Sequence, residues 1–147
     1  MYIGLFHTHS SLRYLVLLLL IAVIVKSLIG FVNKKPFEKV DNMLSLFLLI
    51  FTHIQLLVGL ALYFKSDAVK FNDQTMSNDV ARYWAVEHVT GMLIAVVLIT
   101  IARSTSKRMT ESVAKHKRLF IFNTIALLII IAILLHGGIS IIGSDRV

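Results

Sequence analysis

The sequence contains no cysteine, only one proline and only eight acidic residues among its 147 positions. Without cysteine the chain can form no disulfide, thiolate metal site, iron–sulfur cluster or thioether-linked haem, so any metal must be held by histidine, carboxylate or methionine. The sequence also lacks an internal repeat, a glycine loop that could cradle a phosphate, and a GxS-type nucleophile motif. These absences argue against the chemistry of soluble enzymes.

Apolar residues dominate what is present. They make up 57% of the chain, and the mean hydropathy of +0.82 lies far above that of a soluble domain. Four stretches each offer about 20 mostly apolar residues, the length that a helix needs to cross ~30 Å of hydrocarbon. They are residues 2–25, 43–64, 83–102 and 119–142. We therefore predict an all-α integral membrane four-helix bundle that forms one domain over residues 1–147.

The positive charges predict how this bundle is oriented. Lysine and arginine collect in cytoplasmic loops, and they are concentrated in the first and third connections, at Lys26, Lys34, Lys35, Lys39, Arg103, Lys107, Arg108, Lys115, Lys117 and Arg118. The start of the chain has no basic region and no small-residue cleavage site of a signal peptide, so the first span should stay attached. We expect a multi-pass protein of a bacterial inner membrane with both termini on the non-cytoplasmic side.

The net charge of +7 is mostly this topological signal, together with attraction to anionic lipid headgroups. Basic and aromatic residues do not interleave, so no nucleic-acid partner is expected.

Ionisable residues inside membrane spans are costly and are therefore candidates for function. The predicted spans hold one arginine, Arg13, and one carboxylate, Glu87. They also hold five histidines, which are His7, His9, His53, His88 and His136. His116 lies in a basic run on the predicted cytoplasmic rim, where we expect it to contact water or headgroups. Gln55 and Asn123 are the buried amides; each either joins helices or holds a quinone carbonyl.

Depth separates the histidines, because two axial ligands of one haem must lie at about the same height. At ~1.5 Å per residue, His88 lies roughly 22 Å above the cytoplasmic end of its span, His9 roughly 26 Å and His136 about 27 Å. His53 lies near the midplane, at about 16 Å. This favours a pairing of His9 with His88, with His53 as the competitor. Imidazole is the expected haem ligand in a cysteine-free bundle, whose core commonly holds cofactors.

Zinc and copper remain alternatives, because imidazole suits both metals. A zinc site would need three or four ligands, and adjacent Glu87 and His88 point about 100° apart on a helix.

Two features of the same layer stay open at this stage. Arg13 either pairs with Glu87 across the bundle, holds a haem propionate or reaches outward to headgroups. The small residues Gly91 and Ala95 follow His88 on one helix stripe, and they either let helices approach closely or make room for a macrocycle. Farther out, the aromatic residues Tyr2, Tyr63, Tyr83 and Trp84 are expected to form an interfacial belt.

Three segments carry a resemblance to a known family: FHTHSSLRY in the first span, FTHIQLLVGLALYF in the second and RYWAVEHVTGM in the third. With the length and the charged connections, they resemble the small four-helix "cytochrome b" membrane proteins of Bacteroidota. The resemblance implies a b-type haem held by histidines, with His9, His53 and His88 as candidate ligands and His116 as a further one.

The residues and the resemblance together favour electron transfer over stand-alone enzyme chemistry. A low-spin haem b with two histidine ligands has no open coordination site. We therefore expect a respiratory-chain component or subunit that exchanges electrons with quinone or a periplasmic partner; whether it holds one haem or two is left open. Two rival hypotheses are a structural or assembly subunit without haem and a small transporter or proton relay.

Overall fold

The computed structural model describes residues 2–65, 77–78 and 82–136, and this part of the chain is entirely helical apart from turns. Its elements are α1 (Tyr2–Val32), α2 (Lys39–Lys65), the π-helical turn η1 (Tyr83–Glu87), α4 (His88–Arg108) and α5 (Ser112–His136). In the described residues, four helices are long and apolar enough to cross a membrane. The prediction of four long apolar helices is confirmed. Residues 137–142, the end of the predicted fourth span, lie outside the described residues.

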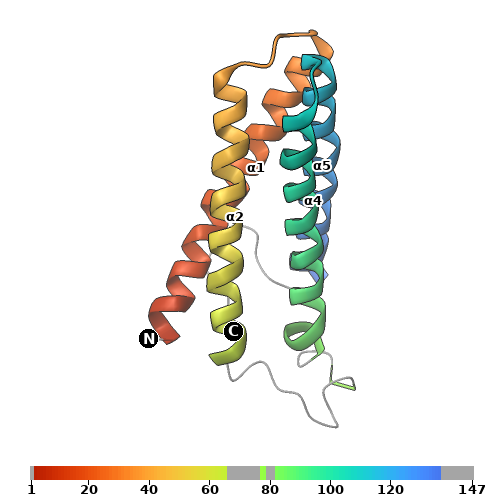
Figure 1. The fold of residues 1–147 in the computed structure, drawn as a ribbon. Coiled ribbons are helices and arrows are strands. Elements are labelled where there is room, and N and C mark those ends of the chain that lie inside the picture. The colour runs from red at the N-terminus through yellow and green to blue at the C-terminus, as the bar shows by residue number, and fades with distance from the viewer. Residues whose placement is uncertain (1, 66–76, 79–81, 137–147) are drawn as a thin grey trace.

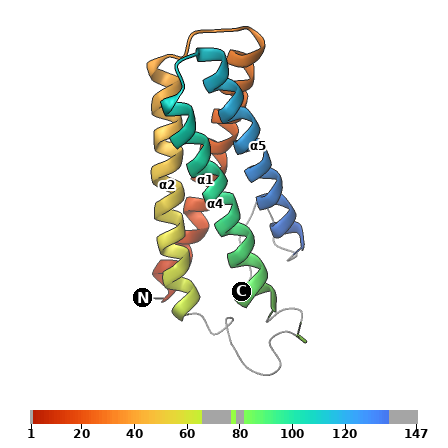
Figure 2. The ribbon, with the colours of Figure 1, turned by 45° about the vertical axis from the view of Figure 1, so that its right-hand side comes forward.

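The four long helices run alternately up and down (Figure 1). Helix α1 crosses the bundle at a slant: it lies beside α5 at one end and moves away from α5 toward the other, as both Figure 1 and Figure 2 show. We call the end with the connections 33–38 and 109–111 the basic end. The opposite end, where α1 begins and α5 finishes, carries most of the histidines and is called the histidine end.

The helices extend further toward the basic end than the apolar segments predicted. Helix α1 runs to Val32 instead of stopping at residue 25, and α5 begins at Ser112 instead of residue 119. The loops between helices at this end are therefore only 33–38 and 109–111. Hydropathy reports where a helix leaves the hydrocarbon, whereas backbone hydrogen bonding lets the helix continue through polar residues.

Local signals end α1 and begin α2. Lys34 adopts a left-handed backbone (φ 51°), and the N–H of Lys35 bonds to the carbonyl oxygen of Gly30 at 2.9 Å, the closure of a Schellman motif. The side chain of Asp41 then reaches back to the N–H of Glu38 at 2.9 Å, which is half of a capping box at the start of α2. Both signals were readable in the sequence only once the helix ends were known.

The core between the ends is apolar, and much of the outer surface is apolar as well. Leu20, Leu48, Ile99 and Ala126, one from each long helix, lie in the buried cluster. The outer surface exposes large apolar side chains, with Phe64 at 80% relative exposure. A fold with apolar residues both inside and outside suits a lipid environment, where only the helix backbone must be satisfied internally.

Candidate functional site

His9 lies on the side of α1 that faces the bundle. Arg13 and Val16 follow it at i+4 and i+7, and both are buried, with Arg13 only 8% exposed. The ring of His9 packs against α2 at Gly59, where an added Cβ would lie 3.1 Å from the ring Cε1. Gln55, one turn earlier on α2, donates from Nε2 to the backbone carbonyl of His9 at 2.9 Å. His9 thus lies at the histidine end, where α2 contacts both its ring and its backbone.

His88 lies on the buried stripe of α4, where it begins the helix after a π-helical turn. The hydroxyl of Tyr83 donates to the carbonyl oxygen of Ile133 at 3.0 Å and lies 3.4 Å from Nδ1 of His88. The single hydroxyl proton serves the carbonyl, which can only accept, so the Tyr83 oxygen can bond the His88 ring only when Nδ1 carries the proton. In the neutral ring this pattern places the lone pair on Nε2.

Tyr83 is therefore a functional candidate that sequence reasoning assigned to the interfacial belt. It is buried, and its ring lies 5.7 Å from that of His88 and 6.1 Å from that of His136. The belt assignment of Tyr83 is wrong because the π-helical turn rotates it into the α4–α5 interface. A π-turn inserts one residue per turn and often marks a functional site, but neither composition nor hydropathy reveals where it falls.

The surroundings of Gly91 show whether the small residues after His88 allow a close helix contact or leave room for a macrocycle. A Cβ on Gly91 would lie 2.5 Å from Cγ1 of Ile133, so α5 fills the space beside this glycine. Ala95, one turn on, is buried in the core as well. The stripe after His88 is thus a close helix contact between α4 and α5, and a macrocycle cannot lie on it.

His53 and His136 are exposed, and neither lies on a core-facing stripe. Nδ1 of His53 donates to the carbonyl oxygen of Leu49 at 2.8 Å, within its own helix. Thr52, the preceding residue of the helix, is buried. Because neighbouring residues on a helix point about 100° apart, the exposed ring of His53 is directed away from the core. The structure therefore does not bring His53 together with His9 and His88.

Arg13 and Glu87 do not form the pair considered from the sequence. Glu87 lies 3.5 Å from Nε of Arg82 and 3.1 Å from Nε2 of His136. Arg13 is buried, donates to the hydroxyl of Tyr14 at 2.7 Å and has its guanidinium 4.6 Å from the centre of that ring. Arg13 thus contacts its neighbour on α1, whereas Glu87 contacts Arg82 and the end of α5.

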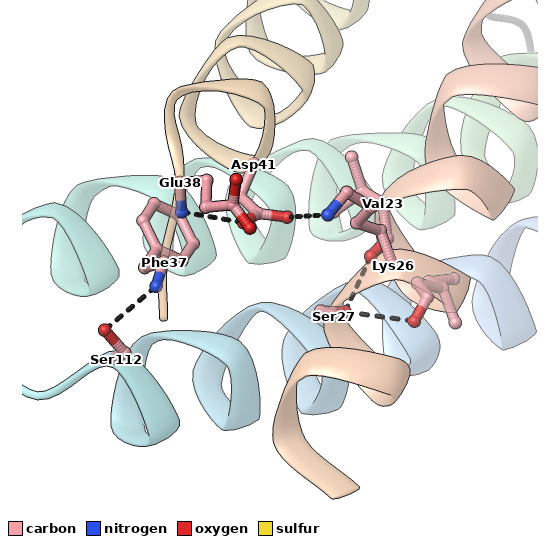
Figure 3. A network of polar contacts seen from close by, with 8 residues as sticks. Val23, Lys26, Ser27, Phe37, Glu38, Asp41 and Ser112 are labelled. Atoms are coloured by element: carbon pink, nitrogen blue, oxygen red, sulfur yellow. Dashed lines mark hydrogen bonds and ion pairs between the residues drawn. The ribbon is translucent and has the colours of Figure 1, made fainter. Parts of the chain in front are cut away.

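The basic end contains buried polar groups that the sequence analysis missed. We expected Arg13 and Glu87 to be the charges inside the spans, with Lys26 and Arg103 in the connections. Arg103 is only 8% exposed, and its Nη1 donates to Asn42 and Ser45 of α2 at 2.6 to 2.8 Å. Buried Asp41 forms an ion pair with Lys26 at 2.9 Å (Figure 3). The expectation is wrong because these side chains point between the helices instead of outward to headgroups.

His116 is the largest correction among the histidines. It is 1% exposed instead of solvated, although it stands in a basic run. Its ring lies against Gly30 of α1, where a Cβ would meet three ring atoms at 2.5 to 2.6 Å, and 5.2 Å from the ring of Phe37. Because it lies at the basic end, His116 cannot share one iron with His9 or His88.

His9 and His88 come from different helix pairs, and both lie on core-facing stripes. One imidazole from each could hold a metal that needs two protein ligands, as a haem iron does. Among the described residues, no group of three or more histidines, cysteines or carboxylates is arranged to hold a metal ion.

Comparisons of the chain with protein-family models, curated proteins and solved structures find no match.

Proposed function

We propose that the chain is a membrane-embedded electron-transfer protein that binds a b-type haem at the histidine end, with His9 and His88 as its axial ligands. In this proposal the histidine end faces the non-cytoplasmic side of a bacterial inner membrane, and the redox partner is quinone or a protein on that side. The haem supplies one-electron chemistry at an iron with no open site for substrate.

The observation that carries the proposal is the contact between Tyr83 and His88. By accepting from Nδ1–H, the Tyr83 hydroxyl fixes the ring orientation and leaves the Nε2 lone pair for a metal, which is the usual arrangement around a metal-binding histidine. The same hydroxyl is anchored to the carbonyl of Ile133, so α5 holds the ligand of α4 in place. An imidazole that serves only as packing needs no such defined tautomer.

Two further groups support the site. Gln55 tethers the backbone of His9 to α2, and Gly59 leaves room for the His9 ring, so both would keep this ligand on its helix pair. Arg13 is buried one turn from His9 and would suit a haem propionate, since guanidinium binds carboxylates in a bidentate way. The filled stripe at Gly91 restricts the macrocycle to the side of His88 that faces away from Ile133.

One observation favours a structural subunit as the second candidate. The polar contacts at the histidine end connect neighbouring helices, such as Gln55 with α1 and Tyr83 with α5, and the Gly91 contact brings α4 and α5 together. Such contacts are also what a bundle without a cofactor uses to fix its packing. The two candidates differ in whether the folded protein takes up haem.

Absorption spectroscopy of the purified chain, prepared with haem available, tests the proposal. We expect a Soret band that shifts on reduction with dithionite and a sharp alpha band. His9→Ala and His88→Ala should each remove the low-spin spectrum. His53→Ala and His136→Ala are matched controls, because both histidines are exposed, and both variants should keep it.

Two results would contradict the proposal. A folded, colourless protein would support the structural subunit instead. Loss of the spectrum in His53→Ala with retention in His9→Ala would show that the ligand pair is wrong while haem binding stands.

A further inference from the structure

The basic end holds a small cavity between α1, α2 and α5 that is separate from the proposed haem site. Its volume is about 10 Å³, and its polar lining consists of Lys26, Ser27, Asp41 and His116. The rest of the wall is made of three apolar side chains. A polar cavity holds one water molecule from roughly 10–15 Å³ upward, so this cavity is about the size of a single water.

The cavity is lined by His116, whose ring nitrogens need hydrogen-bond partners. Both of its ring nitrogens are buried, and neither has a hydrogen-bond partner among the described residues. Buried side-chain nitrogens in folded proteins are nearly always bonded to protein or to ordered water. The ring cannot turn to find another partner, because its face is held against Gly30 and its neighbour is the ring of Phe37.

The opposite wall of the cavity offers partners for a water. Nζ of Lys26 lies 2.9 Å from Oδ1 of Asp41, and the other carboxylate oxygen accepts from the N–H of Glu38 (Figure 3). Ser27 directs its hydroxyl to the carbonyl oxygens of Val23 and Ile24, at 2.6 and 3.0 Å, so its proton is already used. The Ser27 oxygen can then only accept from a water, and the charged pair is the group in the lining that can bond a water through both a donor and an acceptor.

We infer that this cavity binds one water molecule, which bridges the imidazole of His116 to the Lys26–Asp41 ion pair. The water would join α5 to α1 and α2, three helices that meet at this end. Because the Lys26 side chain is 40% exposed, the same bridge would connect an almost fully buried imidazole to the aqueous surface. A metal ion is a poorer occupant, since the described residues contain no cluster of three ligands and the carboxylate is already paired.

Nuclear magnetic resonance on the full chain in lipid nanodiscs tests the inference directly. With ring-¹⁵N-labelled histidine, we expect magnetisation transfer from a bound water to the ring of His116. The signal is assigned by its loss in His116→Phe. If the ring of His116 shows no transfer from water under conditions in which His136, exposed at the end of α5, does, the inference is wrong.

A double-mutant cycle gives an independent measurement. His116→Phe keeps an aromatic ring at this position but removes both nitrogens, and Asp41→Asn removes the carboxylate charge. If a water joins the two residues, their effects on the unfolding equilibrium in mixed micelles should deviate from additivity by roughly three- to tenfold. His116→Phe combined with Ser11→Ala, an exposed serine of α1, should be additive.

Strict additivity in the first cycle would also overturn the inference. Should His116→Phe fail to fold, assignment of the ring signal can use Gly30→Ser, which perturbs the ring contact, and the transfer measurement on the unmodified chain still decides.

Discussion

The two ends of the bundle handle polar residues differently. At the basic end, Arg103, Asp41 and His116 are all buried between helices. At the histidine end Arg13 is buried too, but Glu87 and His136 form a partly exposed pair. The helices are joined by short loops at the basic end, and α1 lies close to α5 there, whereas α1 moves away from α5 toward the histidine end (Figures 1 and 2).

This difference indicates separate roles for the two ends. Buried polar groups with fixed partners specify how helices pack, and removing one partner is costly. A site that must take up a large cofactor needs side chains that are positioned but not sealed off. At the basic end these buried groups hold the helices together, and the histidine end is the layer in which we propose that the haem binds. The following predictions test this contrast, beginning with the largest expected effect.

The acceptors of Arg103 should matter most for stability. Asn42→Ala combined with Ser45→Ala leaves a buried guanidinium with the backbone carbonyl of residue 42 as its remaining acceptor. We expect a loss of about 2–4 kcal/mol in the free energy of unfolding, measured by denaturant titration in mixed micelles. Adding Arg103→Met should restore most of the lost stability, because it removes the charge that lacks acceptors. If stability does not recover, the hydrogen bonds of Arg103 to α2 are not what holds the helices together at this end.

Glycine substitutions compare the two ends directly. Gly30→Ala places a Cβ 2.5 Å from the ring of His116, and we expect it to lower the unfolding free energy by about 1–3 kcal/mol through overpacking. Gly4→Ala is the matched control, because nothing lies within 4 Å of its added Cβ. It should be neutral or gain up to ~1 kcal/mol, as alanine favours helices. Equal effects at both positions would refute the tight contact at the basic end.

Tyr83→Phe probes the histidine end. The variant loses the hydroxyl that bonds to the carbonyl of Ile133 and to Nδ1 of His88. We expect the free energy of unfolding to fall by about 0.5–1.5 kcal/mol. In the haem-loaded protein we also expect a shifted reduction potential, because Nδ1 of the proposed ligand His88 loses its contact with the Tyr83 hydroxyl. A purely structural tyrosine would change stability and leave the potential unaltered.

Glu87→Gln should have the smallest effect. Its partners Arg82 and His136 are both partly exposed, at 32% and 57% of their side-chain surface. Exposed ion pairs contribute about 0.2–1 kcal/mol and are screened by salt, so the difference from the unmodified chain should disappear at high ionic strength. A larger loss that persists in salt would show that this pair belongs to a buried network like that of the basic end.

The sequence predicted the helices well because each depends on local composition. Four apolar segments of membrane-spanning length are enough to specify four helices, and helical phase put Gly91 and Ala95 on the stripe of His88. The pairing of His9 with His88 by depth also follows from residue number along a helix, and it stays a prediction. The sequence did not show which side of each helix faces its neighbours. Adjacent residues on a helix point about 100° apart, so an error of one residue changes which side chains are buried.

Particular residues show where that information was missing. His116 and Arg103 stand in basic runs that look solvated, yet each is buried because its helix turns it toward a neighbouring helix. Tyr83 looked like a residue of the membrane interface until the π-helical turn directed it between α4 and α5. Gly91 could equally have served a cofactor or a helix contact, and only the position of Ile133 decided between them.

The sequence by itself determined the helical fold of the described residues and its four long apolar helices, because backbone hydrogen bonding and hydropathy act along the chain. The tertiary structure alone decided which charged and aromatic side chains face inward, which helices approach at their glycines, and that the two ends differ. Those features depend on contacts between residues far apart in sequence, where the rotation and spacing of whole helices set the environment of each side chain.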